Sequence, residues 1–111
     1  MFHVLHIKEV SEHVNESDIV KSILKYLKSV PRCFAWKEHG GMYGTAGVPD
    51  IIACICGAFF AFEVKTAEGR TTKLQDATIR KINACGGRAV VVRSVEEVKA
   101  AIAAAHLEVA L

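Results

Sequence analysis

The sequence lacks a strong excess of charge of either sign and lacks any long apolar run. Fourteen lysine and arginine residues stand against twelve acidic residues, a formal net charge of +2, so overall charge does not by itself indicate a nucleic-acid partner. The first ten residues include Lys8 and Glu9, and no apolar stretch is long enough for a signal sequence or a membrane span. We therefore expect a cytoplasmic protein with no membrane partner.

The sequence also lacks internal repeats and linker-like segments. Its 111 residues, 51% of them hydrophobic and 23% charged, fit one compact domain over residues 1–111 with a single core. A chain this short buries a limited fraction of its surface, so we expect it to pair with a second copy of itself.

Cysteines are few, and nothing in the sequence places them in an oxidising compartment. Without a secretion signal, Cys33, Cys54, Cys56 and Cys85 are expected to be free thiols. Cys54 and Cys56 are two apart in an apolar run, so a strand would place them on one face. A structural zinc site usually needs wider spacing and a second ligand pair. Core packing is therefore favoured, with a zinc-binding protein as an alternative.

Three segments have helical patterns. Apolar residues recur at helical spacing over 15–30, and Pro31 marks the end of this helix. Thr71 or Thr72 can cap a helix that runs to about Cys85. Ser94 and Glu97 form a capping-box pattern for a last helix. The residues expected to face the core are Ile19, Val20, Ile23, Leu24 and Leu27 in the first helix, and Leu74, Thr78, Ile79 and Ile82 in the second.

Four segments have strand character, at 33–38, 48–56, 58–66 and 88–93. Gly57 separates the second and third and predicts a hairpin. The element order is then α-β-β-β-α-β-α, with a helical crossover before the last strand. This order predicts an α/β fold in which helices flank a mixed central sheet.

The third strand carries an unusual pair of charges. Its side chains alternate, so Ala61, Glu63 and Lys65 share one face, while the opposite face is apolar, with Phe60, Phe62 and Val64. A carboxylate and an ammonium group in such a strand are costly to bury unless they pair, bind a metal or line a cleft. The strand therefore favours a functional site over a charged pair on a solvated strand face.

Asp50 supplies a second carboxylate to this site. It stands at the start of the preceding strand, and the hairpin returns the chain so that Glu63 lies close to it. Paired carboxylates are typical ligands of Mg²⁺, and a cation there would activate water and stabilise a charged transition state. Lys65 would stabilise developing negative charge. Taken singly, these residues would be a turn aspartate and a solvated ion pair, but jointly they predict a catalytic centre.

The sequence around these residues resembles a nuclease family. The motif Pro49-Asp50 followed by Glu63-Val64-Lys65 resembles that of the PD-(D/E)xK superfamily. The surrounding sequence resembles a stand-alone VRR-NUC (virus-type replication-repair nuclease) domain over roughly residues 16–94. This second resemblance rests on the run Gly47-Val48-Pro49-Asp50, on Gln75 in the next helix and on the Gly-Gly-Arg-Ala-Val-Val-Val strand. The resemblance implies a restriction-endonuclease-like core and a Mg²⁺- or Mn²⁺-dependent DNA endonuclease. It also implies a homodimer that acts in DNA repair on branched DNA such as Holliday junctions.

The resemblance also implies a role for each residue that matches the motif. Asp50, Glu63 and the Val64 main-chain carbonyl would be metal ligands, and Lys65 the catalytic lysine. Gln75 would support this lysine or contact the phosphate. Helical spacing places Gln75 in line with Ile79, which aims it inward.

Glu16 is a further candidate metal ligand. By helical periodicity it falls in the middle of the apolar stripe of the first helix, at the N-terminal end where the helix dipole favours a negative charge. The family resemblance also places an acidic residue on this helix beside the metal, with Glu12 as the fallback. A simple first-turn charge with no role in metal binding remains an equal alternative.

Basic residues suggest where DNA would lie. Lys73 and Arg80 are seven residues apart on the outward face of the middle helix, where they could contact phosphates. Further candidates flanking the cleft are Lys37, Arg70 and Arg88. A solvated surface is the alternative for each of them, and a DNA-junction-binding module that has lost cleavage is the alternative for the protein.

Overall fold

The computed structural model describes residues 14–39 and 44–107 of the chain. The helices are α2 (Glu16–Ser29), α3 (Lys73–Ala84) and α4 (Val95–Ala104), and the strands are β1 (Cys33–Lys37), β2 (Ile51–Ile55), β3 (Ala58–Val64) and β4 (Arg88–Val92). The predicted element order is confirmed. The two central strands are shorter than predicted, because β2 begins only after Pro49 and Asp50 and β3 ends before Lys65.

Each described helix begins at a side-chain cap, and the sequence predicts those of α3 and α4. The Asn15 side chain accepts the Asp18 N–H at 2.9 Å at the start of α2, and Thr72 caps α3. At the start of α4, the Ser94 hydroxyl accepts the Glu97 N–H at 3.2 Å. The predicted capping box is only half formed there, because the Glu97 carboxylate accepts the N–H of Arg93 rather than that of Ser94.

The four strands form one mixed sheet in the order β1-β2-β3-β4. β1 and β2 are antiparallel, as are β2 and β3, whereas β4 runs parallel to β3. The predicted hairpin is present: Cys56 and Gly57 have φ angles of 50° and 83°, and positive φ at both central residues is typical of the two-residue type I′ turn. The parallel connection from β3 to β4 runs through α3.

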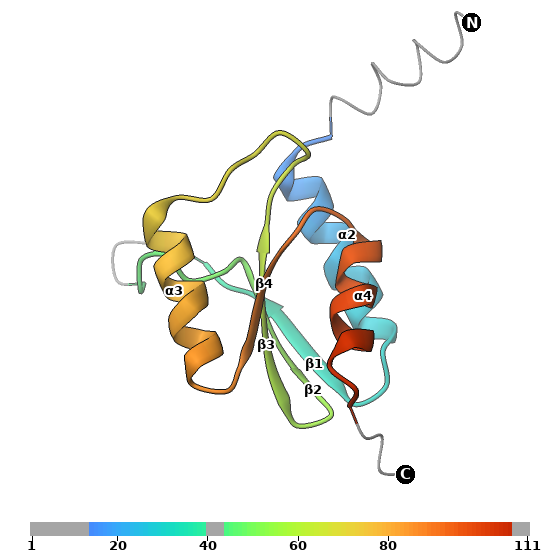
Figure 1. Cartoon of the computed structure of the whole chain (residues 1–111). Coiled ribbons are helices and arrows are strands. Elements are labelled where there is room, and N and C mark those ends of the chain that lie inside the picture. The colour runs from blue at the N-terminus through green and yellow to red at the C-terminus, as the bar shows by residue number, and fades with distance from the viewer. Residues whose placement is uncertain (1–13, 40–43, 108–111) are drawn as a thin grey trace, which may run out of the picture.

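The sheet is covered by helices on both faces, with α2 and α4 on one face and α3 on the other (Figure 1). The alternation predicted for β3 is confirmed. The larger core lies under α2 and α4 and includes Phe60, Phe62 and Val64, whereas Ala61 faces α3, where Ile79 and Ile82 pack against it. One face of β3 is therefore a packed core, and the other leads into the polar site.

Two predictions about apolar residues are wrong. Leu74 does not enter the core but is 53% exposed, because the first turn of α3 lies over the loop at Gly47 instead of over the sheet. Cys54 and Cys56 do not share a face: Cys54 is an exposed strand residue, while Cys56 lies in the turn and packs against the core under α2 and α4.

The prediction of free thiols is confirmed. All four are free. Within residues 14–39 and 44–107, no group of three or more histidine, cysteine, aspartate or glutamate residues is placed to hold a metal ion. No helix in the same ranges is long and apolar enough to cross a membrane.

The packing of β3 makes a stability prediction. Phe62 is fully buried and stacks on Phe60 with ring centroids 5.8 Å apart, so Phe62→Ala is expected to lower the free energy of unfolding by about 3–5 kcal/mol. Phe59 is 47% exposed on the same strand, and Phe59→Ala should cost at most about half as much. Urea unfolding followed by circular dichroism measures both, and equal losses would contradict the assigned faces of β3.

Candidate active site

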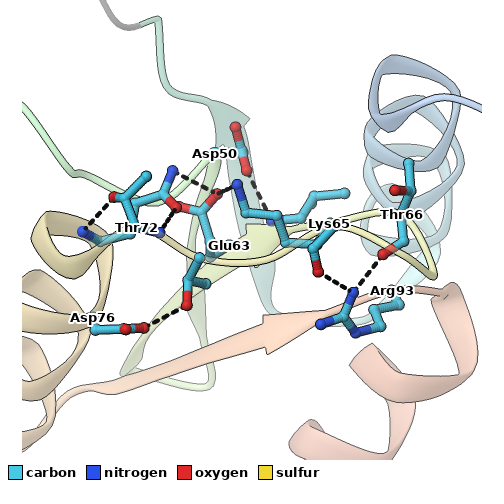
Figure 2. Close-up of polar contacts among 11 residues, drawn as sticks. Asp50, Glu63, Lys65, Thr66, Thr72, Asp76 and Arg93 are labelled. Carbon is cyan, nitrogen blue, oxygen red and sulfur yellow. Dashed lines mark hydrogen bonds and ion pairs between the residues drawn. The ribbon is translucent and has the colours of Figure 1, made fainter.

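Asp50 and Glu63 face each other across the hairpin. The β2–β3 register pairs Ile51 with Phe62, and one further step of the register places Asp50 opposite Glu63. Main-chain pairing stops at this point, and the Val64 N–H instead donates to Oδ2 of Asp50 at 2.8 Å. Figure 2 shows this bond joining the start of β2 to the end of β3. The chain thus fixes the Asp50 carboxylate beside the end of β3, as the sequence predicts.

Glu63 is the most strongly perturbed acid of the site. Its side chain is almost fully buried, with the residue 2% exposed. Burial, together with a hydrogen bond to Asp50 and the negative charge of Asp50, raises the pKa of Glu63 from its ordinary value of 4.5 to about 8. Without a cation, a proton therefore occupies the space between the two carboxyl groups near neutral pH.

Lys65 lies on the same face as Glu63. Its Nζ is 3.8 Å from Oε2 of Glu63, the residue is only 9% exposed, and its positive charge partly opposes the rise in the pKa of Glu63. The main chain of Lys65 extends the parallel pairing, because its N–H donates to the Val92 carbonyl at 3.1 Å. β4 therefore holds Lys65 in line with β3.

The Val64 carbonyl lies on the side of β3 that carries Asp50. Along a strand, the N–H and C=O of one residue point to the same edge, and the Val64 N–H points to Asp50. The carbonyl oxygen is therefore directed to the edge of β3 that faces β2 and Asp50. Its role as a metal ligand stays a prediction.

Gln75 reaches the site from the first turn of α3. Its Oε1 accepts the Thr72 N–H at 2.9 Å, while the Gln75 N–H donates to the Thr72 hydroxyl at 3.1 Å, which completes a capping box. With its oxygen held in this way, the amide turns Nε2 toward Glu63, where it makes a long contact of 3.5 Å with Oε2. The inward direction predicted for Gln75 is thus what the cap produces.

The loop before Asp50 is pressed against α3. Gly47 has a φ of 81°, and a Cβ added there would lie 2.8 Å from Cγ of Leu74 and from Oγ1 of Thr78. Only glycine combines this positive φ with such a close approach. The contact ties the segment that carries Asp50 to the helix that carries Gln75.

Glu16 differs in part from its prediction. It is the first residue of α2, but it is exposed instead of pointing into the core, because the buried stripe of α2 begins one turn later, at Val20. Its charge is nevertheless close enough to add to the rise in the pKa of Glu63. A direct ligand role for Glu16 stays a prediction. Glu12 lies outside the described residues.

Arg93 supports the site and was not identified from the sequence. Its guanidinium donates to two carbonyls of the loop that follows Lys65, those of Thr66 and of Gly69, the latter at 2.9 Å (Figure 2). Because β4 is parallel to β3, a residue just beyond the end of β4 lies beside the loop that leaves β3. A lone arginine directly after an apolar strand is the one sequence signal that could have indicated it.

The residues suggested for DNA contact are all exposed. This holds for Lys37, Arg70, Lys73, Arg80 and Arg88. The guanidinium of Arg88 lies 5.8 Å from the centre of the Phe60 ring, so part of its interaction is with the protein itself. Exposure fits both phosphate contact and simple solvation, and the DNA role of these residues stays a prediction.

Comparison with known proteins gives a clear result at the level of structure. No family model matches the sequence, and no curated protein matches it either. Solved structures do match, among them one described as "VRR_NUC domain" and one described as "VRR_NUC domain protein", each with a TM-score of 0.67 and 20% identity. They cover 79% and 81% of this chain, and the matches span 94% and 86% of the solved chains. The chain has the VRR_NUC fold.

Within this VRR_NUC fold, the donor atoms suit a hard divalent cation. The carboxylates of Asp50 and Glu63 and the carbonyl of Val64 offer oxygen only, the ligand type that Mg²⁺ and Mn²⁺ prefer. Burial and the facing Asp50 disfavour the charged form of Glu63. A bound cation would stabilise that charged form in place of a proton.

The raised pKa predicts how the stability of the metal-free protein depends on pH. Between 4.5 and about 8 the folded protein keeps a proton on Glu63 that the unfolded chain loses, so the free energy of unfolding falls as pH rises through this range. Urea unfolding in EDTA at about pH 5 and about pH 8.5 should show a loss roughly 1–3 kcal/mol larger in wild type than in Glu63→Gln. Identical pH dependence in both proteins would contradict the assignment.

The loop contacts of Arg93 make a second prediction. Arg93→Ala removes the donor to two loop carbonyls and is expected to lower the free energy of unfolding by about 1–3 kcal/mol. Limited proteolysis should cut the loop after Lys65 faster in this variant. Arg80→Ala, at an exposed position of α3, is the matched control and should stay within about 0.5 kcal/mol of wild type. Equal stability of both variants would show that the hydrogen bonds from Arg93 to the Thr66 and Gly69 carbonyls contribute nothing to the free energy of unfolding.

Proposed function

We propose that this chain is a Mg²⁺- or Mn²⁺-dependent endonuclease that hydrolyses phosphodiester bonds in DNA. The observation that carries the proposal is the placement of Asp50, Glu63 and Lys65. Two facing carboxylates, one of them almost fully buried, and a buried lysine meet at one end of the sheet. A purely structural ion pair would not need a second carboxylate that raises the pKa of the first.

Each residue of the chain has a distinct task in this reaction. Asp50, Glu63 and the Val64 carbonyl would hold the cation, and a bound Mg²⁺ would supply positive charge against the negative charge that develops on the phosphate. Lys65 adds a second positive charge from the protein, held by its ion pair with Glu63. Gln75 orients the Glu63 carboxylate through its amide.

The proposal extends to the substrate and the assembly. The family resemblance of the sequence and the fold of the solved VRR_NUC structures support DNA as the partner. We propose branched DNA, such as a Holliday junction, as the preferred substrate and a homodimer as the acting form. Exposed basic residues on α3, Lys73 and Arg80, would contact phosphates beside the site.

The proposal is tested by cleavage of labelled DNA. Purified protein is incubated with a four-way junction, a flap and a linear duplex in Mg²⁺, Mn²⁺ or EDTA. Nicking is expected only with a metal, and Lys65→Ala should slow it by roughly a hundredfold or more, with Asp50→Asn and Glu63→Gln equally impaired. Lys81→Ala, an exposed lysine of α3, is the matched control and should cleave like wild type.

Two outcomes would contradict the proposal. Wild type that leaves every substrate intact with both metals, yet binds the junction tightly, would identify a binding module that has lost cleavage. Cleavage that persists in EDTA, or in Lys65→Ala with its circular dichroism spectrum unchanged, would rule out the assigned centre.

A further inference from the structure

The outer edge of β1 carries an aromatic pair that no described helix covers. Phe34 is 71% exposed and Trp36 is 42% exposed, and their rings contact each other with centroids 5.6 Å apart. They face the α3 side of the sheet, because Cys33 and Ala35 on the same strand pack toward the opposite core. α3 covers Ala61 and Ala89 farther along the sheet and leaves the β1 side of this face open.

The aromatic surface continues across the sheet. The register pairs Phe34 with Cys54 and Cys54 with Phe59, and both of these neighbours are exposed. Phe59, at 47% exposure, also lines an apolar hollow with Ile82 and Gly87. Soluble proteins rarely leave such a continuous apolar patch open to water, and patches of this kind mark interaction sites.

The edge of β1 also offers unused main-chain groups in a fixed pattern. Residues paired through hydrogen bonds to β2 include Glu38, whose N–H donates to the Asp50 carbonyl, and Arg32, whose carbonyl accepts the Cys56 N–H. Because hydrogen-bonded pairs alternate along an antiparallel ladder, the even-numbered residues of β1 point their main chain to β2. Cys33, Ala35 and Lys37 point theirs outward, and no other described strand pairs with that side of the sheet.

This pattern is self-complementary about Ala35. If a second copy pairs antiparallel along this edge with Ala35 opposite its own counterpart, the outward groups of Cys33 meet those of Lys37 in the other chain. Phe34 then lies opposite Trp36 of the second copy, in a non-hydrogen-bonded pair, where side chains across a ladder are closest. One twofold axis thus joins both aromatic pairs into a single cluster.

A polar contact also holds Trp36 in place. Glu38 accepts the indole N–H of Trp36 at 3.0 Å, so its carboxylate lies on the aromatic face of β1.

From this complementarity we infer that the outer edge of β1 is the homodimer interface, through which two sheets join into one with Ala35 at the twofold axis. The inference rests on the homodimer of the proposed function and adds its surface and register. A second copy explains both the outward main-chain groups and the aromatic patch, whereas stacking of DNA bases on Phe34 and Trp36 would use only the patch.

The test measures oligomeric state without DNA or metal, so a failure of the nuclease activity leaves it unaffected. Sedimentation equilibrium is expected to show wild type as a dimer, and Phe34→Glu should raise its dissociation constant roughly tenfold or more. Leu74→Glu changes an apolar residue of similar exposure on α3 and should remain dimeric. Circular dichroism checks that both variants are folded.

A further readout reports on the surface. Trp36 is the only tryptophan of the chain, so dilution of wild type should shift its emission to the red as the interface opens, and Phe34→Glu should show the red emission at every concentration.

The inference is overturned if wild type is monomeric at every concentration, or if it is a dimer that Phe34→Glu does not weaken. A monomer in which Phe34→Glu reduces binding of single-stranded DNA would instead identify a base-stacking surface. A monomer whose Trp36 emission is blue at every dilution would mean that another part of the same chain covers the patch.

Discussion

The hydrogen bond from the Val64 N–H to the Asp50 carboxylate is the contact on which the rest of the site depends. It forms where the antiparallel pairing of β2 and β3 ends, so a side chain replaces the main-chain acceptor at the last position of the hairpin. This side-chain hydrogen bond holds Asp50 opposite Glu63 and leaves the Val64 carbonyl on the edge of β3 that faces β2. The geometry of the carboxylate pair is thus a property of the hairpin and needs no loop to close over it.

The burial of Glu63 follows from the same hairpin. A strand packed on both faces leaves no room for a solvated carboxylate, and the facing Asp50 makes the charged form still less favourable. The free protein accommodates this cost with a proton and with the ammonium group of Lys65. A positive charge near Glu63 therefore stabilises the pair, and the proposed cation would supply one.

Much of this could be predicted from the sequence because it follows from local periodicity. The alternation of apolar and charged residues in β3 identified the faces of Glu63 and Lys65, and Gly57 located the hairpin that brings Asp50 to them. Thr71 or Thr72, together with Ser94, identified the starts of α3 and α4, because caps are local interactions. These predictions depend on neighbours within a few residues.

Other features depend on contacts that a sequence does not display. Leu74 has the spacing of a core residue but lies over the Gly47 loop, because the position of α3 on the sheet is set by tertiary packing. Glu16 is exposed for a similar reason: the first turn of α2 extends beyond the core. Arg93 reaches a loop more than twenty residues earlier in the chain, and only the parallel pairing of β3 and β4 brings the two together.

Gln75 takes part both in the local cap of α3 and in a tertiary contact between α3 and β3. Its oxygen completes the cap of α3 while its nitrogen faces Glu63, so the amide has one orientation that satisfies both partners. Formation of the first turn of α3 and orientation of the Gln75 amide toward Glu63 are therefore coupled. If this turn frays, Gln75 loses that orientation even while the sheet stays folded, so the proposed activity would depend on helix nucleation as well as on the chemistry of the site.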